Sequence, residues 1–256
     1  MVMKFVNLIL TNVCVVSLLL ISGCAGKVQL LESGQKMTLK STVQYIPRMT
    51  FLDGKEQSYE ASENPYLDIR SKVNKGSVLL FIEAKKAKRN GQLSVAKQKL
   101  GVITKKDESL SGPWSMLGDI AVAEKEFKIA TAYYKKSIQI TPQNVNAYTA
   151  LATAKRLMGE FNVSQHTLEA ALKIWPDFPE AHLNLGILYD MYLNKPEQAQ
   201  MHMEAYLYLT GYKNKQAKAW FEEVRSRTGI TTSFIVDKAL DIKVAKSVVN
   251  QKQAKE

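Results

Sequence analysis

Cysteine and histidine are scarce in this chain, and the short motifs that mark many enzyme sites are missing. The 256 residues include two cysteines and three histidines. The sequence has no Gly-rich phosphate loop, no Gly-x-Ser-x-Gly and no His-Glu-x-x-His. We therefore expect that the protein is not an enzyme, and we expect no catalytic residue, cofactor, metal or small-molecule substrate.

Charge is also scarce at the N-terminus. Lys4 is the only charged residue before a run from Phe5 to Ile21 that carries none. A short positive start followed by an apolar core is typical of a secretory signal. The run is nearly long enough to span a bilayer, so a retained transmembrane anchor is the alternative.

The apolar run ends at residues 21–24 with Ile-Ser-Gly-Cys, which resembles the lipobox of bacterial lipoproteins. The resemblance implies that residues 1–23 are a signal peptide and that Cys24 becomes the acylated first residue. Ala25 follows where inner-membrane lipoproteins of enteric bacteria usually carry Asp, which implies the periplasmic face of the outer membrane in an organism with two membranes. Cys14 would leave with the signal, so the mature fold must rest on packing without a disulfide.

Positive charge predominates in the chain as a whole. The net charge is +11, and 46% of the residues are hydrophobic, enough to bury a core. In a cytoplasmic protein this charge would suggest nucleic acid, but export excludes that partner. Phospholipid headgroups, lipopolysaccharide phosphates and an acidic protein remain as anionic partners. A solvated basic surface without a partner is the alternative.

Residues 24–76 differ from the rest of the chain because glycine and proline recur there without a helical period. Residues 42–51 have some strand character, but no obvious partner strand follows them. We interpret residues 24–76 as the lipidated cysteine followed by a flexible tether, with local packing on the domain as the alternative.

A period of 34 residues runs through much of the remaining sequence. Trp114, Tyr148 and His182 stand 34 residues apart. The same step relates Leu117 to Leu151 and Leu185, Gly118 to Ala152 and Gly186, and Pro142 to Pro176. His182 is therefore expected to pack as the aromatic residues at its position do, and His166 and His202 are not predicted to form a metal site.

These positions resemble the tetratricopeptide repeat (TPR), which has an aromatic residue, Leu-Gly, Ala and a closing Pro at fixed places in 34 residues. The resemblance implies an all-α fold, a right-handed α-solenoid of helix pairs. We expect repeats at 77–110 (degenerate), 111–144, 145–178 and 179–213, a capping helix at 214–229 and a C-terminal tail at 230–256. The expected structural residues are Trp114, Leu117, Gly118, Ala130, Tyr134, Pro142, Tyr148, Leu151, Pro176, Leu185 and Gly186.

The physical reason for the pattern is close helix packing. Small residues let the two helices of a unit approach, and proline ends the second helix because it cannot donate the helical hydrogen bond. No unit can bury its apolar face alone, so neighbouring units build the core together. Trp114 is expected to be buried between units.

Repeats of this family bind peptides or protein segments in a concave groove formed by the first helix of each unit. Arg156 and Asp190 occupy the same position in neighbouring repeats, and we expect them to orient a polar segment or to pair with each other. Asn184 alone matches a carboxylate-clamp position, so capture of a C-terminal peptide is not predicted. The resemblance places these residues in the groove: Lys85, Lys88, Arg89, Met116, Asp119, Thr149, Thr153, Arg156, Asn184, Ile187 and Asp190.

Together these features predict a lipid-anchored adapter that holds a protein partner near the outer membrane. Similar lipoproteins act as pilotins for secretins, in outer-membrane biogenesis or beside TonB-type systems. The alternative is a binding module for an anionic envelope polymer or lipid surface, which would use the basic residues of the first repeat.

Acylation of Cys24 is the first testable prediction. The wild-type chain should incorporate radiolabelled palmitate and fractionate with membranes, whereas Cys24→Ala should lose both properties because it lacks the acylated sulfur. A Cys24→Ala chain that keeps its label and its membrane fraction would contradict the lipobox interpretation.

Overall fold

The structure is a computed structural model that describes residues 38–52, 55–57, 59–69 and 73–236. Cys24, the signal at 1–23 and the end of the tail from 237 lie outside the described residues. No helix within the described part is both long and apolar enough to cross a membrane.

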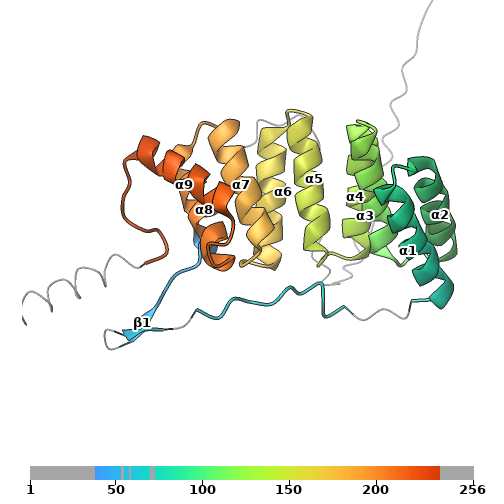
Figure 1. Ribbon diagram of the computed structural model, residues 1–256, viewed down its shortest axis with the longest axis horizontal. Helices are drawn as coiled ribbons and strands as arrows, with labels where there is room; N and C mark the ends of the chain where they lie inside the picture. The colour runs from blue at the N-terminus through green and yellow to red at the C-terminus, as the bar shows by residue number, and fades with distance from the viewer. Residues whose placement is uncertain (1–37, 53–54, 58, 70–72, 237–256) are drawn as a thin grey trace, which may run out of the picture. The chain divides into compact units, whose positions relative to one another are not determined.

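The described chain is an all-α repeat of nine helices with one short two-stranded hairpin (Figure 1). Helices α1 to α8 form four antiparallel pairs, and each pair packs on the next. The last helix, α9 (Lys215–Thr228), packs on α8. The pairs are α1 (Lys75–Arg89) with α2 (Leu93–Lys106), α3 (Ser111–Ala123) with α4 (Phe127–Ile140), α5 (Val145–Leu157) with α6 (Phe161–Ile174), and α7 (Pro179–Met191) with α8 (Pro196–Leu209).

The turn inside each pair repeats one backbone conformation at the sequence period. Gly91, Lys125 and Gly159 stand 34 residues apart and have φ values of 74°, 61° and 75°. Asn194 continues the series one residue late, with φ 50°. This left-handed conformation suits glycine and strains a lysine. The extra residue before Asn194 explains why the fourth repeat needs 35 residues instead of 34.

Small residues set the distance between the helices of a pair. A methyl group on Gly118 would lie 2.5 Å from the Tyr134 ring, and one on Gly186 would lie 2.9 Å from Met203. Ala130 and Ala199 are fully buried. The predicted role of Gly118 and Gly186 in close packing thus agrees with the geometry.

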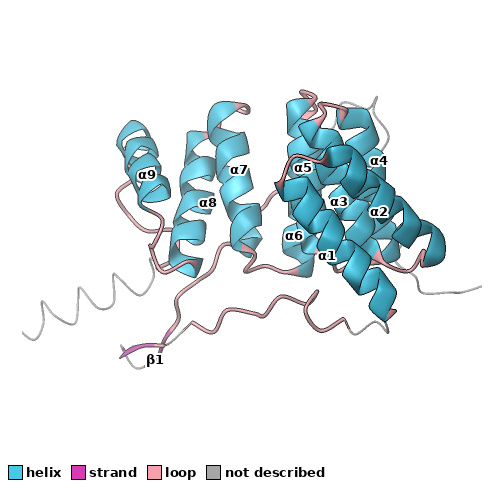
Figure 2. Cartoon of the chain, turned by 45° about the vertical axis from the view of Figure 1, so that its right-hand side comes forward, coloured by secondary structure: helices cyan, strands magenta, loops and turns pink. Residues whose placement is uncertain are grey.

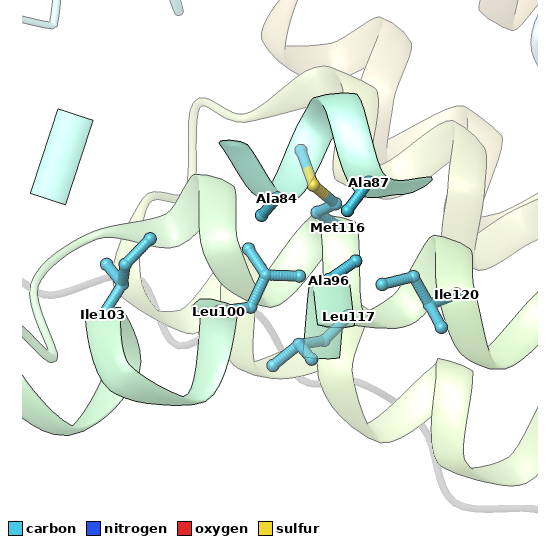
Figure 3. Packing of buried hydrophobic residues seen from close by; sticks show 8 residues of the cluster. All are labelled: Ala84, Ala87, Ala96, Leu100, Ile103, Met116, Leu117 and Ile120. Carbon is cyan, nitrogen blue, oxygen red and sulfur yellow. The ribbon is translucent and has the colours of Figure 1, made fainter. Parts of the chain in front are cut away.

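Apolar side chains from α1, α2 and α3 gather in a common core (Figure 3). Ala84, Ala96, Leu100 and Ile120 are fully buried there. Trp114 packs against this core but is only partly buried, and its ring lies 5.9 Å from that of Tyr133. The sequence analysis expected Trp114 to be buried between units.

The segment that precedes the helices is packed on them. We call the described residues between Thr38 and Ile69 the strap. The strap contains β1 (Phe51–Leu52) and β2 (Lys55–Glu56), which pair as a hairpin. After the hairpin it runs along one edge of the helices to α1 (Figures 1 and 2). Tyrosines and hydroxyl groups, described below, hold it there.

Two glycine-to-alanine changes should separate packing from helix propensity. Gly118→Ala should lower the free energy of unfolding by about 1–3 kcal/mol, because Tyr134 must shift. Gly101→Ala in α2 meets no atom within 4 Å, so it should raise that free energy by about 0.5–1 kcal/mol. Urea unfolding followed by circular dichroism measures both, and equal effects would contradict the assigned packing.

Candidate functional site

The residues predicted to line a groove lie on α1, α3, α5 and α7, the first helices of the four pairs. We call this surface the first-helix face. Its neighbouring members contact each other directly, α3 with α5 and α5 with α7. Some of the predicted residues already make hydrogen bonds or ion pairs within the described part of the protein and others do not. The two ends of the face differ in this respect.

At the α7 end, charged side chains are bound within the protein. Asp190 accepts hydrogen bonds from Trp220 at 2.8 Å and from Arg227 at 2.6 Å, both on α9. Arg156 donates to the Tyr192 hydroxyl at 3.0 Å and lies 5.2 Å from the centre of that ring. Arg156 and Asp190 therefore do not pair with each other, because each has a nearer partner.

The middle of the face is polar and also bound internally. Thr153 donates to the Thr149 carbonyl at 2.9 Å and lies 3.4 Å from the Asn184 side chain. The Asn184 amide donates to the Glu180 carbonyl at 2.7 Å. Ile187 is half-buried beside them. These groups can receive a polar ligand only by exchanging hydrogen bonds that they already make.

At the α1 end, two of the predicted cations remain free. Lys88 pairs with Asp119 at 2.5 Å, and Asp119 also accepts from the Tyr134 hydroxyl at 2.9 Å. Burial, with Asp119 beside it, raises the pKa of Tyr134 well above its usual value. Lys85 and Arg89 are exposed and have no ion pair within the described part of the chain.

Met116 does not belong to the exposed face. Its exposed fraction is 9%, and it packs in the core between α1 and α3. Its position in the repeat faces the preceding helix pair, which fills the space where a ligand would have to lie.

A pocket of about 780 Å³ opens where the strap meets the starts of α1 and α3. Phe81 and Val78 line it from α1, and Leu67 and Ile69 line it from the strap. Leu67 is 78% exposed. Ser77 also lines the pocket, and its buried hydroxyl has no hydrogen-bond partner. The pocket thus offers apolar walls and one unsatisfied polar group.

The strap is fixed to the helices at two carboxylates. Glu169 on α6 accepts a hydrogen bond from Tyr45 at 3.0 Å and pairs with Lys40 at 3.3 Å. Asp177, between α6 and α7, accepts from the Tyr59 hydroxyl and from both the backbone and side chain of Ser62 at 2.7 Å. Burial, with Asp177 beside it, raises the pKa of Tyr59 well above its usual value. These partners hold the strap on both sides of the hairpin.

A buried chain of hydrogen bonds joins the strap to two histidines. A carbonyl can only accept, so His182 donates from Nε2 to Pro176 at 2.9 Å and presents a bare Nδ1. His202 then donates from Nδ1 to that nitrogen at 2.9 Å, and its Nε2 accepts from Thr42 at 2.7 Å. The Tyr189 hydroxyl lies 3.1 Å from Thr42 and completes the chain.

Both histidines are neutral in this arrangement. Burial lowers the pKa of His182 to about 4, against smaller opposite effects from the Pro176 carbonyl and Asp177. Burial and the neighbouring His182 lower the pKa of His202 well below its usual value. A protonated ring would carry a charge without hydration at this buried site. Its additional N–H group would also disrupt the chain of hydrogen bonds.

No group of three or more metal-binding side chains gathers among the residues that the structure describes. Glu169 follows His166 by three residues, a spacing suited to a metal pair that the sequence analysis did not count. Glu169 instead binds Tyr45 and Lys40, and His166 Nε2 lies 2.7 Å from the Thr38 carbonyl.

The sequence analysis missed the strap contacts and the histidine pair. His182 and His202 stand 20 residues apart on different helices, so no local spacing reveals them. The repeat offered one signal. His182 replaces an aromatic residue at a core position, and a buried histidine needs a hydrogen-bond partner.

Comparison with known proteins agrees with this geometry. Residues 112–144 match the tetratricopeptide repeat family. These residues are therefore assigned as one tetratricopeptide repeat. The match covers the second helix pair, the copy that follows the repeat pattern best.

Solved structures share the fold of the helical region. Residues 41 to the end of MamA from Desulfovibrio magneticus RS-1 align with a TM-score of 0.52 at 14% identity, over 70% of this chain and 97% of that one. A thermophilic TPR protein of Thermus thermophilus aligns with a TM-score of 0.52 at 16% identity, over 58% of this chain and 80% of that one. No curated protein matches the chain. Identities this low establish the fold alone.

The buried histidines predict that acid destabilises the helical domain. Below about pH 6.5 the unfolded chain protonates both rings, whereas folded His182 stays neutral to about pH 4. The free energy of unfolding should therefore fall as the pH drops through this window, by on the order of 1–2 kcal/mol per histidine between pH 7 and 5. Urea titrations across this range measure the effect.

A matched variant isolates the contribution of the pair. His202→Gln should be less stable than wild type at pH 7.5, because the chain from Thr42 is broken, and should lose less stability on acidification. A wild-type stability that stays constant from pH 7.5 to 5 would contradict the neutral buried pair.

Proposed function

We propose that the protein is a lipid-anchored periplasmic scaffold whose TPR domain binds a protein partner in an envelope assembly. The lipobox-like residues 21–24 support the anchor, and Ala25 supports the outer membrane as its location. The TPR domain supports the binding role, because helical repeats of this kind present extended binding surfaces.

The observation that carries the proposal is the apolar pocket where the strap meets the starts of α1 and α3. Protein-binding sites combine apolar anchor pockets with a polar surround. Phe81 lies inside the pocket and Lys85 follows it one helical turn later, on the same side of α1. Arg89 continues the row by a further turn. A partner segment with an apolar side chain followed by acidic residues fits this sequence of contacts.

The rest of the first-helix face limits where the partner binds. Its charges at the α7 end are already bound, Asp190 by α9 and Arg156 by Tyr192. A ligand there would have to displace these interactions. The partner is therefore expected at the first two repeats and not along the whole face.

A second candidate function is binding to an anionic envelope polymer or lipid surface. The sequence from 75 to 106 contains nine basic residues and one acidic residue, a concentration that favours this alternative. Exposed charges at distances beyond about 10 Å are screened at 0.1 M salt, so polymer binding through them should collapse as salt rises. An apolar pocket contact should persist.

The test compares three variants in pull-downs with the acylated protein from its own membranes. Leu67→Gln with Val78→Gln removes apolar pocket walls, and Lys85→Glu with Arg89→Glu reverses the free cations. Each should reduce partner capture at least tenfold, equivalent to about 1.4 kcal/mol. Circular dichroism checks that each variant remains folded.

The matched control changes Lys136 and Lys173 to Glu on the second helices α4 and α6. Its net charge equals that of the reversed pair on α1, so it tests charge without position. Retained capture in the control supports a localised partner site. Equal loss in both charge variants would favour polymer binding, and unchanged capture in all three would contradict the site.

A further inference from the structure

Helix α1 leaves apolar side chains exposed at the end of the stack. Leu79 is 56% exposed and Ile82 is 57% exposed. They lie on the side of α1 opposite the core residues Ala84 and Ala87. No described helix covers this side, because α1 packs mainly on α2 and has no helix pair before it.

The repeat period shows what usually covers such a side. The residues equivalent to Leu79 in the next three repeats are Pro113, Ala147 and Ala181, and all three are buried. Each lies on a first helix that packs on the second helix of the preceding pair: α3 on α2, α5 on α4 and α7 on α6. At Leu79 the corresponding helix is absent from the described chain.

Helix α2 extends the same apolar surface. Glu83 of α1 pairs with Lys99 of α2 at 2.6 Å, which shows that these sides of the two helices face the same way. Val95 and Val102 stand four residues before and three after Lys99, so they share its side of α2. Val95 is 40% exposed and Val102 is 48% exposed. The two helices therefore present a joint patch, which we call the end face.

The end face is set among positive charges. Lys75, Lys86 and Lys106 are exposed around it, and none has an ion pair within the described chain. Apolar patches with a polar rim mark interaction sites. The apolar residues are complementary to the apolar stripe of a helix, and the lysines are complementary to negative charges beside that stripe.

We propose that the end face docks an amphipathic α-helix of a partner protein that carries acidic residues on both sides of its apolar stripe. The docked helix packs with its stripe on Leu79 and Ile82 of α1 and extends over Val95 and Val102 of α2. Of these four residues Ile82 also lines the pocket, whereas Leu79, Val95 and Val102 lie outside it, so the inference goes beyond the proposed function.

A second copy of the chain fits this surface poorly. Two end faces brought together would place the lysines of one copy against those of the other, and like charges disfavour such a contact. The opposite end of the stack shows how a closed end looks. Helix α9 buries Ala217, Phe221 and Val224, and none of its large apolar residues is highly exposed.

The test is photo-crosslinking in cells with the full acylated chain. A benzoyl-phenylalanine at position 79, which lies outside the pocket, should crosslink to a partner segment. Mass spectrometry of that segment should show apolar residues at i, i+3, i+4 and i+7 with Asp or Glu beside them. The same probe at position 222, on the outer side of α9, is the matched control and should give no such product.

A synthetic peptide of the mapped segment then tests the contacts. Leu79→Gln with Ile82→Gln should weaken its binding at least tenfold. Ile129→Gln with Leu157→Gln changes two exposed apolar residues elsewhere and should leave binding unchanged. Glu83→Lys in the wild-type chain should strengthen binding, because it adds positive charge beside the acidic residues of the peptide.

Several outcomes would overturn the inference. These are crosslinks from position 79 to lipid, to a second copy or to residues 1–37 or 237–256 of the same chain, and the absence of any crosslinked product. A mapped segment without acidic residues would also overturn it. A probe at position 85 reports separately on the first-helix face, so the failure of one surface is distinguishable from the failure of the other.

Discussion

The fold depends on the close approach of the two helices in each pair. At Gly118 even one methyl group would lie 2.5 Å from the Tyr134 ring. This distance brings the Tyr134 hydroxyl to Asp119, and Asp119 in turn holds Lys88 from the preceding pair. A contact inside one repeat therefore fixes a side chain of another. The packing of the helices thus determines where these polar side chains lie.

The strap connects repeats that are not adjacent, in a stack whose repeats otherwise contact only their neighbours. Each helix pair touches only the next, so repeats of this type can in principle open from either end. The strap instead joins distant repeats. It binds Glu169 on α6, Asp177 before α7 and the start of α3, where Tyr66 lies 3.3 Å from Ser111. Contacts that span more than a hundred residues make the repeats cooperate.

The repeat domain could be predicted from sequence because its signals are periodic. Trp114, Gly118 and Pro142 recur at a fixed step, and one recognised copy sets the register for the rest. The predicted starts at 111, 145 and 179 coincide with the starts of α3, α5 and α7. Trp114 was correctly placed against the core, but the extent of its burial depends on how far α1 overlaps it, which no spacing records.

The strap and the partners of the site residues could not be predicted in the same way. Thr42 and Tyr59 sit in a segment without period, and their partners lie more than a hundred residues away. Asp190 looked free because the sequence does not show that Arg227 on α9 reaches it. The repeat period predicts equivalent positions along the chain, but hydrogen-bond partners depend on the three-dimensional arrangement of the helices.

The place where the strap joins the helices has a mechanical consequence. A pulling force that arrived from the N-terminal side would reach the domain at Thr38 and Lys40, beside α6, and not at the first helix of the stack. Thr42 and Tyr45 would bear it next, through buried or half-buried hydrogen bonds loaded together. Tension on the chain would thus be carried by the middle of the domain, and α1 would remain at rest.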